Sequence, residues 1–231
     1  DGRQLTWLSW NHPNMPWDGC EVYMAKFASD GHLNDPVLVA GGLDESIFQP
    51  EWSPDNILHF VSDRTGWWNI YRYKKSKIEP LYPMEAEFGQ PQWVFGMSTY
   101  GFESEQAIVC AYSQNGVWNL ARLNTVNKSL EKIDSPYTLI ENIQVGAGKV
   151  VFIGGSPTET SAVLTMDLKS RKIEVIRKSN SLEVDSAYLS VPKTIEFPTE
   201  NKQKAHGFYY PPNNKDCTGP SGELPPLIAI M

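Results

Sequence analysis

The segment from Trp52 to Tyr73 contains two short apolar runs, each preceded by turn residues. The first run, Ile57–Val61, follows Ser53–Asn56, in which Pro fixes φ and Asp and Asn favour tight turns. The second run, Ile70–Tyr73, follows a turn at Ser62–Gly66 and consists of β-prone residues. The segment therefore predicts a β-hairpin. Because a lone hairpin cannot bury both of its faces, it also predicts neighbouring units of the same kind.

Related segments recur along the chain. Trp118–Leu123 repeats the pattern of Trp68–Tyr73, and Gln90–Trp93 nearly repeats Gln49–Trp52, so we expect a third unit to start at Gln90. A fourth unit is expected over residues 137–177. Asp1-Gly2 aligns with Asp55-Asn56, which predicts that the chain begins inside a unit.

Four short strands in roughly 40 to 50 residues are typical of a β-propeller blade. A β-sandwich is the alternative, since it also shows short strands at regular spacing. The matched segments favour an all-β fold, a partial β-propeller of about four four-stranded blades over residues 1–185. From Val191 the pattern changes to a predicted strand pair, and Leu224–Met231 resembles the start of a buried strand, so we expect the chain to continue beyond it.

Composition excludes several classes of function. The 231 residues carry 20 Lys plus Arg against 27 Asp plus Glu, a net charge of -7, which disfavours nucleic acid and anionic membranes as partners. No apolar stretch reaches the ~20 residues of a membrane span, so a soluble protein is expected. Cys20, Cys110 and Cys217 lack the spacing of a disulfide framework or a metal site and indicate a reducing compartment.

The sequence contains no complete catalytic motif. A hydrolase nucleophile elbow requires Gly-x-Ser-x-Gly, and the nearest segments, around Ser156 and Ser221, both lack the closing Gly. Phosphate-binding, dinucleotide-binding and zinc-protease motifs are absent as well, so no cofactor and no metal are expected.

The candidate site residues lie in two predicted loops. His12, Trp17 and Asp18 belong to the loop over residues 11–19, and Arg64 and Trp67 belong to the turn that precedes Ile70. They are candidates for a substrate gate or an interface. A structural role is the favoured alternative for most of them, since Asp-Arg turns tie strand connections together and tryptophans pack blades.

The blade pattern supports a resemblance to known proteins. Trp52–Asp55, Ser62–Gly66 and Asn69–Tyr71 resemble the repeat shared by TolB-type propellers and the propellers of prolyl oligopeptidase family peptidases. Leu5–Gly19 is similar to a loop of acylaminoacyl-peptidase and dipeptidyl-aminopeptidase-like members, plant and bacterial ones especially.

The end of the chain extends this resemblance. Ala205–Pro212 and Gly222–Ile228 resemble the start of that family's α/β-hydrolase domain, just before a His-Gly-Gly-Pro motif. The resemblance therefore implies a hinge and the first hydrolase strands over residues 186–231. It implies that the full enzyme hydrolyses short acyl- or aminoacyl-peptides with a Ser-Asp-His triad, while the propeller restricts entry.

No residue of the triad falls within this chain, so we predict that the chain alone is inactive. The implied compartment is the cytoplasm or a plastid, and a homo-oligomer is left open. The alternative function is a free-standing TolB-type propeller that serves as a protein or peptide interaction module, which requires a closed ring.

Overall fold

The computed structural model describes residues 2–220 and 222, so the strand expected at Leu224–Met231 lies outside the described residues. The described residues form antiparallel sheets and two short 3-10 turns, Ser186–Tyr188 and Glu200–Lys202. The first sheet comprises β1 (Gln4–Ser9), β2 (Glu21–Phe27) and β3 (Leu33–Gly41). The second sheet comprises β4 (Ile47–Trp52), β5 (Leu58–Ser62), β6 (Asn69–Lys74) and β7 (Lys77–Pro80). The third sheet comprises β8 (Tyr100–Ser104), β9 (Ala107–Gln114), β10 (Val117–Asn124) and β11 (Ser129–Ile133). The fourth sheet comprises β12 (Leu139–Gly146), β13 (Lys149–Ser156), β14 (Glu159–Asp167) and β15 (Ile173–Lys178).

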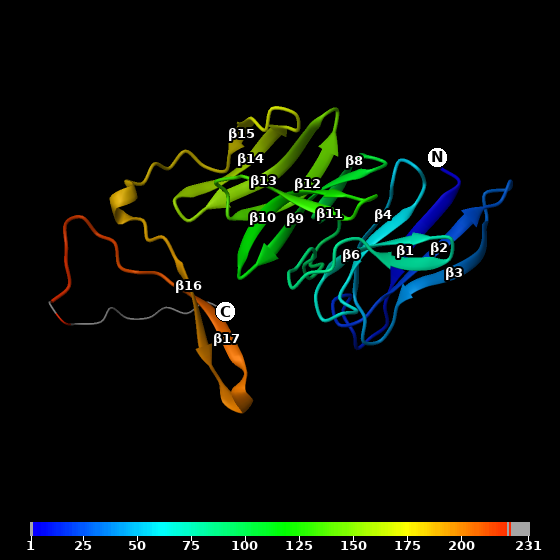
Figure 1. The fold of residues 1–231 in the computed structure, drawn as a ribbon, viewed down its shortest axis with the longest axis horizontal. Coiled ribbons are helices and arrows are strands. Elements are labelled where there is room, and N and C mark those ends of the chain that lie inside the picture. Colours follow the sequence, from blue (N-terminus) through cyan, green and yellow to red (C-terminus); the bar gives the residue numbers. More distant parts are fainter. Residues whose placement is uncertain (1, 221, 223–231) are drawn as a thin grey trace.

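These four sheets follow one another in an arc, each packed face to face on the next (Figure 1). Alternation along the strands explains why both faces of a sheet are buried. In β9, Ile108 and Cys110 face the core shared with the sheet β4–β7, whereas Val109 and Ala111 face the core shared with β12–β15. In β5, Leu58 and Phe60 likewise face the sheet β1–β3. Successive four-stranded sheets that bury both of their faces are characteristic of a partial β-propeller, as predicted.

Three of the four blades have four strands, and the first has three described strands. Since β3 leads into β4 as β7 leads into β8, β3 is the last strand of its blade. β1 therefore corresponds to β5, the second strand of the next blade. This agrees with the alignment of Asp1-Gly2 with Asp55-Asn56.

The predicted start of the third unit at Gln90 is wrong. Gln90–Trp93 lies in the long connection between β7 and β8, and the first strand of the third blade is β8. Its sequence signal is weak because Gly101 is the second of its five residues; an added Cβ there would be 2.9 Å from Val145 Cγ2 of β12. The repeat of the third strand is correct, since β6 and β10 hold equivalent places. In each, an Asn side chain, Asn69 or Asn119, donates to the carbonyl two residues earlier.

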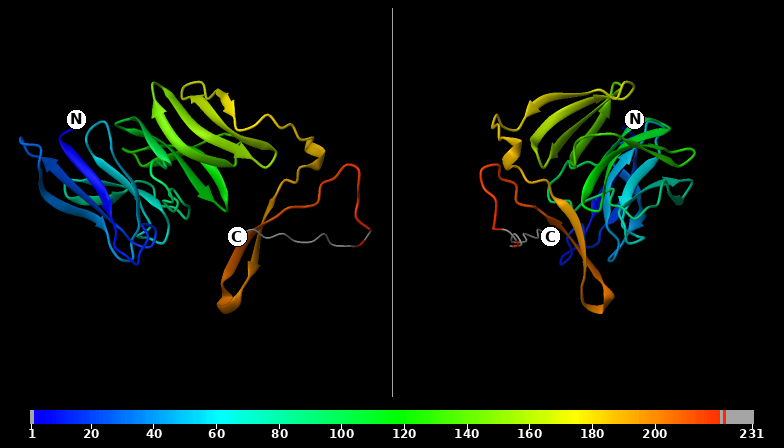
Figure 2. Two further views of the ribbon diagram at one scale, coloured as in Figure 1. Left: turned by 180° about the vertical axis from the view of Figure 1, so that it is seen from behind. Right: turned by 60° about the vertical axis from the view of Figure 1, so that its left-hand side comes forward.

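A separate strand pair follows the blades. β16 (Lys193–Pro198) and β17 (Lys204–Tyr209) form an antiparallel hairpin, which residues 179–192 connect to β15. Figure 2 shows the hairpin projecting from the arc, with the connection leading away from the last blade before it reaches β16. The part of the chain that the structure describes contains no helix with the length and hydrophobicity of a membrane span.

Candidate functional site

The long connections of the blades gather at one end of the strands. Because consecutive strands are antiparallel, the connections after the second and fourth strand of every blade leave from the same end. We call this end the loop face, and it comprises residues 10–20, 42–46, 63–68, 81–99, 115–116, 134–138, 157–158 and the exit at 179–192. The opposite end, the turn face, carries the shorter turns, among them 75–76, 105–106 and 147–148.

Hydrogen bonds between neighbouring loops hold the loop face together. Cys20 N donates to Glu45 O at 3.0 Å, Ser46 N donates to Asp63 Oδ1 at 2.7 Å, and Trp68 N donates to Glu87 Oε2 at 2.9 Å. Further along the arc, Glu87 pairs with Ser113, and Trp118 N donates to Thr138 O at 3.0 Å. The loops thus form one connected layer rather than independent tips.

All of the predicted site residues lie on this face. Asp18 accepts a 2.8 Å hydrogen bond from the Met15 backbone N–H through Oδ2, so its carboxylate closes a turn in its own loop. Asn14 of the same loop donates to Leu43 O at 3.2 Å, which ties the loop to the connection between β3 and β4. The side chain of His12 is exposed.

Arg64 is held by Glu45. The Arg64 Nε and Nη2 atoms donate to the two carboxylate oxygens of Glu45 at 3.0 and 3.2 Å, and the guanidinium lies 5.3 Å from the Tyr71 ring centroid. Ser62 Oγ also donates to Glu45, at 2.7 Å. A bidentate pair of this kind fixes both loops, so the structural alternative describes the contacts of Arg64 well.

The two adjacent tryptophans have different surroundings. Trp68 packs edge-on against Phe48, with ring centroids 6.1 Å apart, and covers Gly89, where an added Cβ would be 2.5 Å from its ring. Trp67 is 39% exposed. Trp68 is therefore the packed tryptophan, and Trp67 is the one that presents aromatic surface on the loop face.

Trp17 leads to a feature that sequence reasoning missed. Its ring centroid lies 4.3 Å from that of Trp93, in the connection between β7 and β8. Trp93 is 72% exposed, and the next two residues, Val94 and Phe95, are 64% and 89% exposed. The signal in the sequence was three consecutive large apolar residues before Gly96 without the alternation of a strand. We call Trp17, Trp93 and Phe95 the aromatic knuckle.

Several carboxylates of the loop face are partly buried. Burial raises the pKa of Glu87. The nearby Asp63 raises this pKa further, whereas the hydrogen bond from the Trp68 backbone N–H lowers it. Burial also raises the pKa of Asp63, opposed by its hydrogen bonds and reinforced by Glu45. Neighbouring loops thus bring carboxylates close enough to repel one another.

The hairpin β16–β17 contacts the loop face. An added Cβ at Gly116, in the turn between β9 and β10, would be 2.4 Å from Phe208 Cζ of β17. The ring of Phe208 therefore rests directly on this turn. The strand pair lies on the face that carries the predicted site residues.

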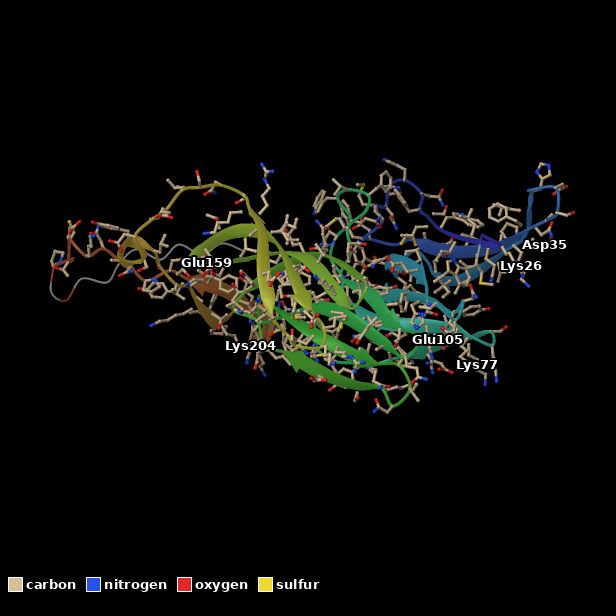
Figure 3. The ribbon with its side chains drawn as sticks, turned by 90° about the horizontal axis from the view of Figure 1, so that it is seen from above. Lys26, Asp35, Lys77, Glu105, Glu159 and Lys204 are labelled. Carbon is tan, nitrogen blue, oxygen red and sulfur yellow. The ribbon has the colours of Figure 1, made fainter. Side chains whose placement is uncertain are left out.

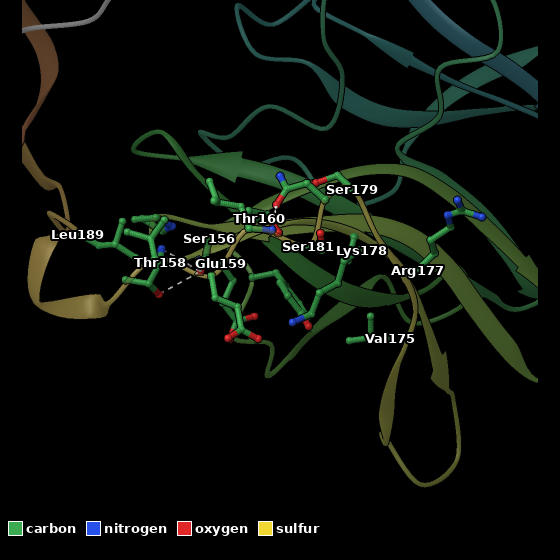
Figure 4. Close-up of a pocket in the computed structure, with 17 residues that line it drawn as sticks. Ser156, Thr158, Glu159, Thr160, Val175, Arg177, Lys178, Ser179, Ser181 and Leu189 are labelled. Atoms are coloured by element: carbon green, nitrogen blue, oxygen red, sulfur yellow. Dashed lines mark hydrogen bonds between the residues drawn. The ribbon is translucent and has the colours of Figure 1, made fainter.

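A hollow of about 1290 Å³ opens between the end of β15, the turn after β13 and the exit segment (Figure 4). Ser156 lies at its edge, and its Oγ accepts from the backbone N–H groups of Thr158 and Glu159 at 3.3 and 3.1 Å. The described residues that line the hollow include no histidine. A turn serine without a neighbouring base is not an activated nucleophile.

Solved structures show what the chain resembles. No protein-family model and no curated protein matches it. A puromycin hydrolase structure is 33% identical over 97% of this chain and 34% of its own, with a TM-score of 0.88. A Mycobacterium tuberculosis puromycin-hydrolysing peptidase is 33% identical over 96% of this chain and 34% of its own, with a TM-score of 0.89. Prolyl oligopeptidase B from Galerina marginata shares the fold, at 10% identity over 91% of this chain and 29% of its own, with a TM-score of 0.67.

The chain resembles a fragment of a prolyl oligopeptidase family peptidase, since it is 33% identical to puromycin-hydrolysing peptidases and shares its fold with prolyl oligopeptidases. It spans about a third of the length of the peptidases that it matches, and the part that it matches is a propeller part. The resemblance drawn from the blade repeat is thereby confirmed.

Proposed function

We propose that this chain is the non-catalytic propeller portion of a serine peptidase that hydrolyses short acyl- or aminoacyl-peptides. In this proposal residues 1–185 belong to the blades, and residues 186–231, of which 223–231 lie outside the described residues, belong to the hinge and the first strands of the catalytic domain. The observation that carries the proposal is the contact of Phe208 with Gly116, because it sets the strand pair after the blades on the loop face. The 33% identity to puromycin-hydrolysing peptidases supports it.

In this proposal the loop face is both the interface with the catalytic domain and the substrate gate. Trp67 and His12 supply exposed surface, whereas Asp18 and Arg64 fix the loops that present it. Trp17 contributes through its contact with Trp93. Linked loops suit this role, since the hydrogen bonds between them hold their relative positions.

The test compares this 231-residue chain with the longer protein that we expect to contain it. We expect the 231-residue chain to cleave no aminoacyl- or acyl-peptide p-nitroanilide and to resist labelling by a serine-reactive phosphonate. The longer protein should cleave short peptides and take up the label. A natural stop codon directly after Met231, or labelling of Ser156 or Ser221, would contradict the proposal and favour a free-standing interaction module.

A further inference from the structure

The two arms that flank the hairpin β16–β17 are joined to each other at its base. Asn213, in the arm that leaves β17, donates through Nδ2 to the carbonyl oxygens of Ser186 and Leu189 at 3.2 and 2.8 Å. Both carbonyls belong to the arm that leads into β16, around its 3-10 turn. In the same arm, Ser190 Oγ donates to Pro211 O. One amide and one hydroxyl therefore tie the two arms together.

Charged and aromatic contacts join the same arms. Lys215 Nζ donates to Asp185 Oδ2 at 2.5 Å and lies 4.9 Å from the Tyr188 ring centroid. The hydroxyl of Tyr188 donates in turn to Asp216. Exposed contacts of this kind are weak one by one, but all of them span the same two arms. We call this set of contacts the clasp, and residues 185–217, which it closes, the strap.

The segment 180–184 joins the strap to the last blade. Ser179 N donates to Ser161 O of β14 at 2.9 Å, whereas the next hydrogen bond, from Leu182 N to Asn180 Oδ1 at 3.0 Å, is local. Residues 180–184 are exposed, and they border the hollow of about 1290 Å³ instead of continuing β15 (Figure 4). Exposed segments outside helices and strands change their backbone angles at little cost and serve as hinges. We call residues 180–184 the pivot.

The strap also touches the blades through Phe208. The ring of Phe208 occupies the space where a Cβ of Gly116 would lie, in the turn between β9 and β10. A ring that rests on a turn separates from it without breaking the hydrogen bonds of a sheet. The strap is thus held together internally by the clasp and attached to the blades by the pivot and this ring.

We propose that the strap moves as one body about the pivot, and that the contact of Phe208 with Gly116 is its closed position. Because the clasp joins both arms, a change of backbone angles in the pivot carries β16 and β17 with it. Phe208 then leaves the loop face and uncovers the turn at Gly116. Two-position elements of this kind are common where a short hinge joins two stiffer parts. The inference goes beyond the proposed function, because it concerns a movement of this chain by itself.

The test measures the separation of two spin labels in the 231-residue chain by pulsed electron paramagnetic resonance. One label is attached to Cys217, which is exposed at the end of the strap, and the other to Glu105→Cys on the turn face. Cys20 and Cys110 are buried and should not be labelled. Figure 3 shows Glu105 well apart from Lys204 of the strap. We expect two separations, of which the more populated belongs to the closed position.

Substitutions in the strap separate its contact with the blades from its internal clasp. Phe208→Ala should raise the population of the second separation roughly five-fold, because an aromatic contact made only in the closed position is lost. Phe197→Ala is the matched control, since Phe197 lies on the opposite face of the hairpin and is 38% exposed. It should leave both populations unchanged. Lys215→Ala with Asn213→Ala should broaden both separations, because the two arms then move independently.

Three outcomes would contradict the inference. A single separation that Phe208→Ala leaves unchanged would show that the strap is fixed. Equal changes in Phe208→Ala and Phe197→Ala would report unfolding of the hairpin instead of movement of the strap. Unchanged widths in the variant with Lys215→Ala and Asn213→Ala would show that the clasp does not hold the strap together. No catalytic activity is measured, so each of these outcomes leaves the proposed function standing.

Discussion

Gln49-Pro50-Glu51-Trp52 and Gln90-Pro91-Gln92-Trp93 differ only at the third position, yet they take different structures. The first forms most of β4 and is tied into the seam between the second and third blades. The second lies in a connection and presents an exposed tryptophan. The difference teaches that the neighbours of a segment, rather than its own residues, decide whether it becomes a strand.

The neighbours of Gln49 are specific. Its Nε2 atom donates to Tyr100 O at 2.8 Å and to Glu51 Oε1 at 2.9 Å, and its Oε1 atom accepts from Thr99 N at 2.7 Å. Tyr100 Oη donates back to Gln49 O at 2.8 Å. One buried amide thus links two blades through both of its polar ends. Among the residues that the structure describes, the Gln90 side chain forms no such link.

The largest expected effect breaks this link. Gln49→Ala leaves the Thr99 N–H and the Tyr100 carbonyl buried without their partner, which should cost about 3 kcal/mol of unfolding free energy. The melting temperature should fall by roughly 6 to 12 °C, as measured by calorimetry. Gln90→Ala is the matched control and should change stability by less than about 0.5 kcal/mol. Equal effects of the two substitutions would show that the seam does not depend on this amide.

The same comparison explains how much could be predicted from the sequence. The short apolar runs bounded by turn residues, such as Ile57–Val61, and the repeat of Trp68–Tyr73 at Trp118–Leu123 were found because their signal is local. β8 was missed, because Gly101 weakens its apolar pattern and because its hydrogen bonds to Gln49 come from a residue far away in the sequence. Local patterns carry no information on such distant partners.

The candidate site was predictable to a similar extent. Trp17 and Trp67 were selected as aromatic residues in loops, and the structure places both on the loop face. Trp93 was placed at the start of the third unit by its match with Trp52, so its contact with Trp17 was not foreseen. A structural role was the favoured alternative for Arg64, but its partner Glu45 lies in another loop and could be identified only from the fold.

The next effect depends on pH and acts in the same seam. His59 of β5 lies opposite Glu51 of β4, and burial lowers its pKa to about 4. Arg72 and Lys74 lower this pKa further, whereas the hydrogen bond with the Ile57 carbonyl and the charge of Asp55 raise it. The folded state therefore binds fewer protons than the unfolded state. Stability should be complete above about pH 6.5 and should fall as the pH approaches 4, by about 3 kcal/mol.

Glu51 acts in the opposite direction. Burial raises its pKa, with the Gln49 hydrogen bond opposing, so protonation on the acid side of neutrality relieves the folded state and offsets part of the loss. His59→Gln should flatten the stability curve between pH 6.5 and 4. Glu51→Gln, which makes the two tetrapeptides identical, should steepen it. Urea unfolding across this pH range measures both, and an unchanged slope in His59→Gln would contradict the assignment.

The smallest expected effect comes from substituting glycines in two turns, one that a side chain packs against and one that no side chain contacts. Gly116 has φ +76°, and Phe208 fills the space where its Cβ would lie. Gly148 has φ +73°, and no atom lies within 4 Å of its added Cβ. Both substitutions to Ala should cost about 1 kcal/mol for the left-handed backbone.

Gly116→Ala should cost roughly 1 kcal/mol more than Gly148→Ala, because the new methyl group displaces Phe208. It should also speed amide hydrogen exchange in β16 and β17 while leaving the blades protected, whereas Gly148→Ala should leave the hairpin unchanged. Hydrogen exchange measured by mass spectrometry resolves the two segments. If both variants exchange alike in the hairpin, Phe208 does not hold the strand pair on the loop face, and the interface proposed for this face loses its main support.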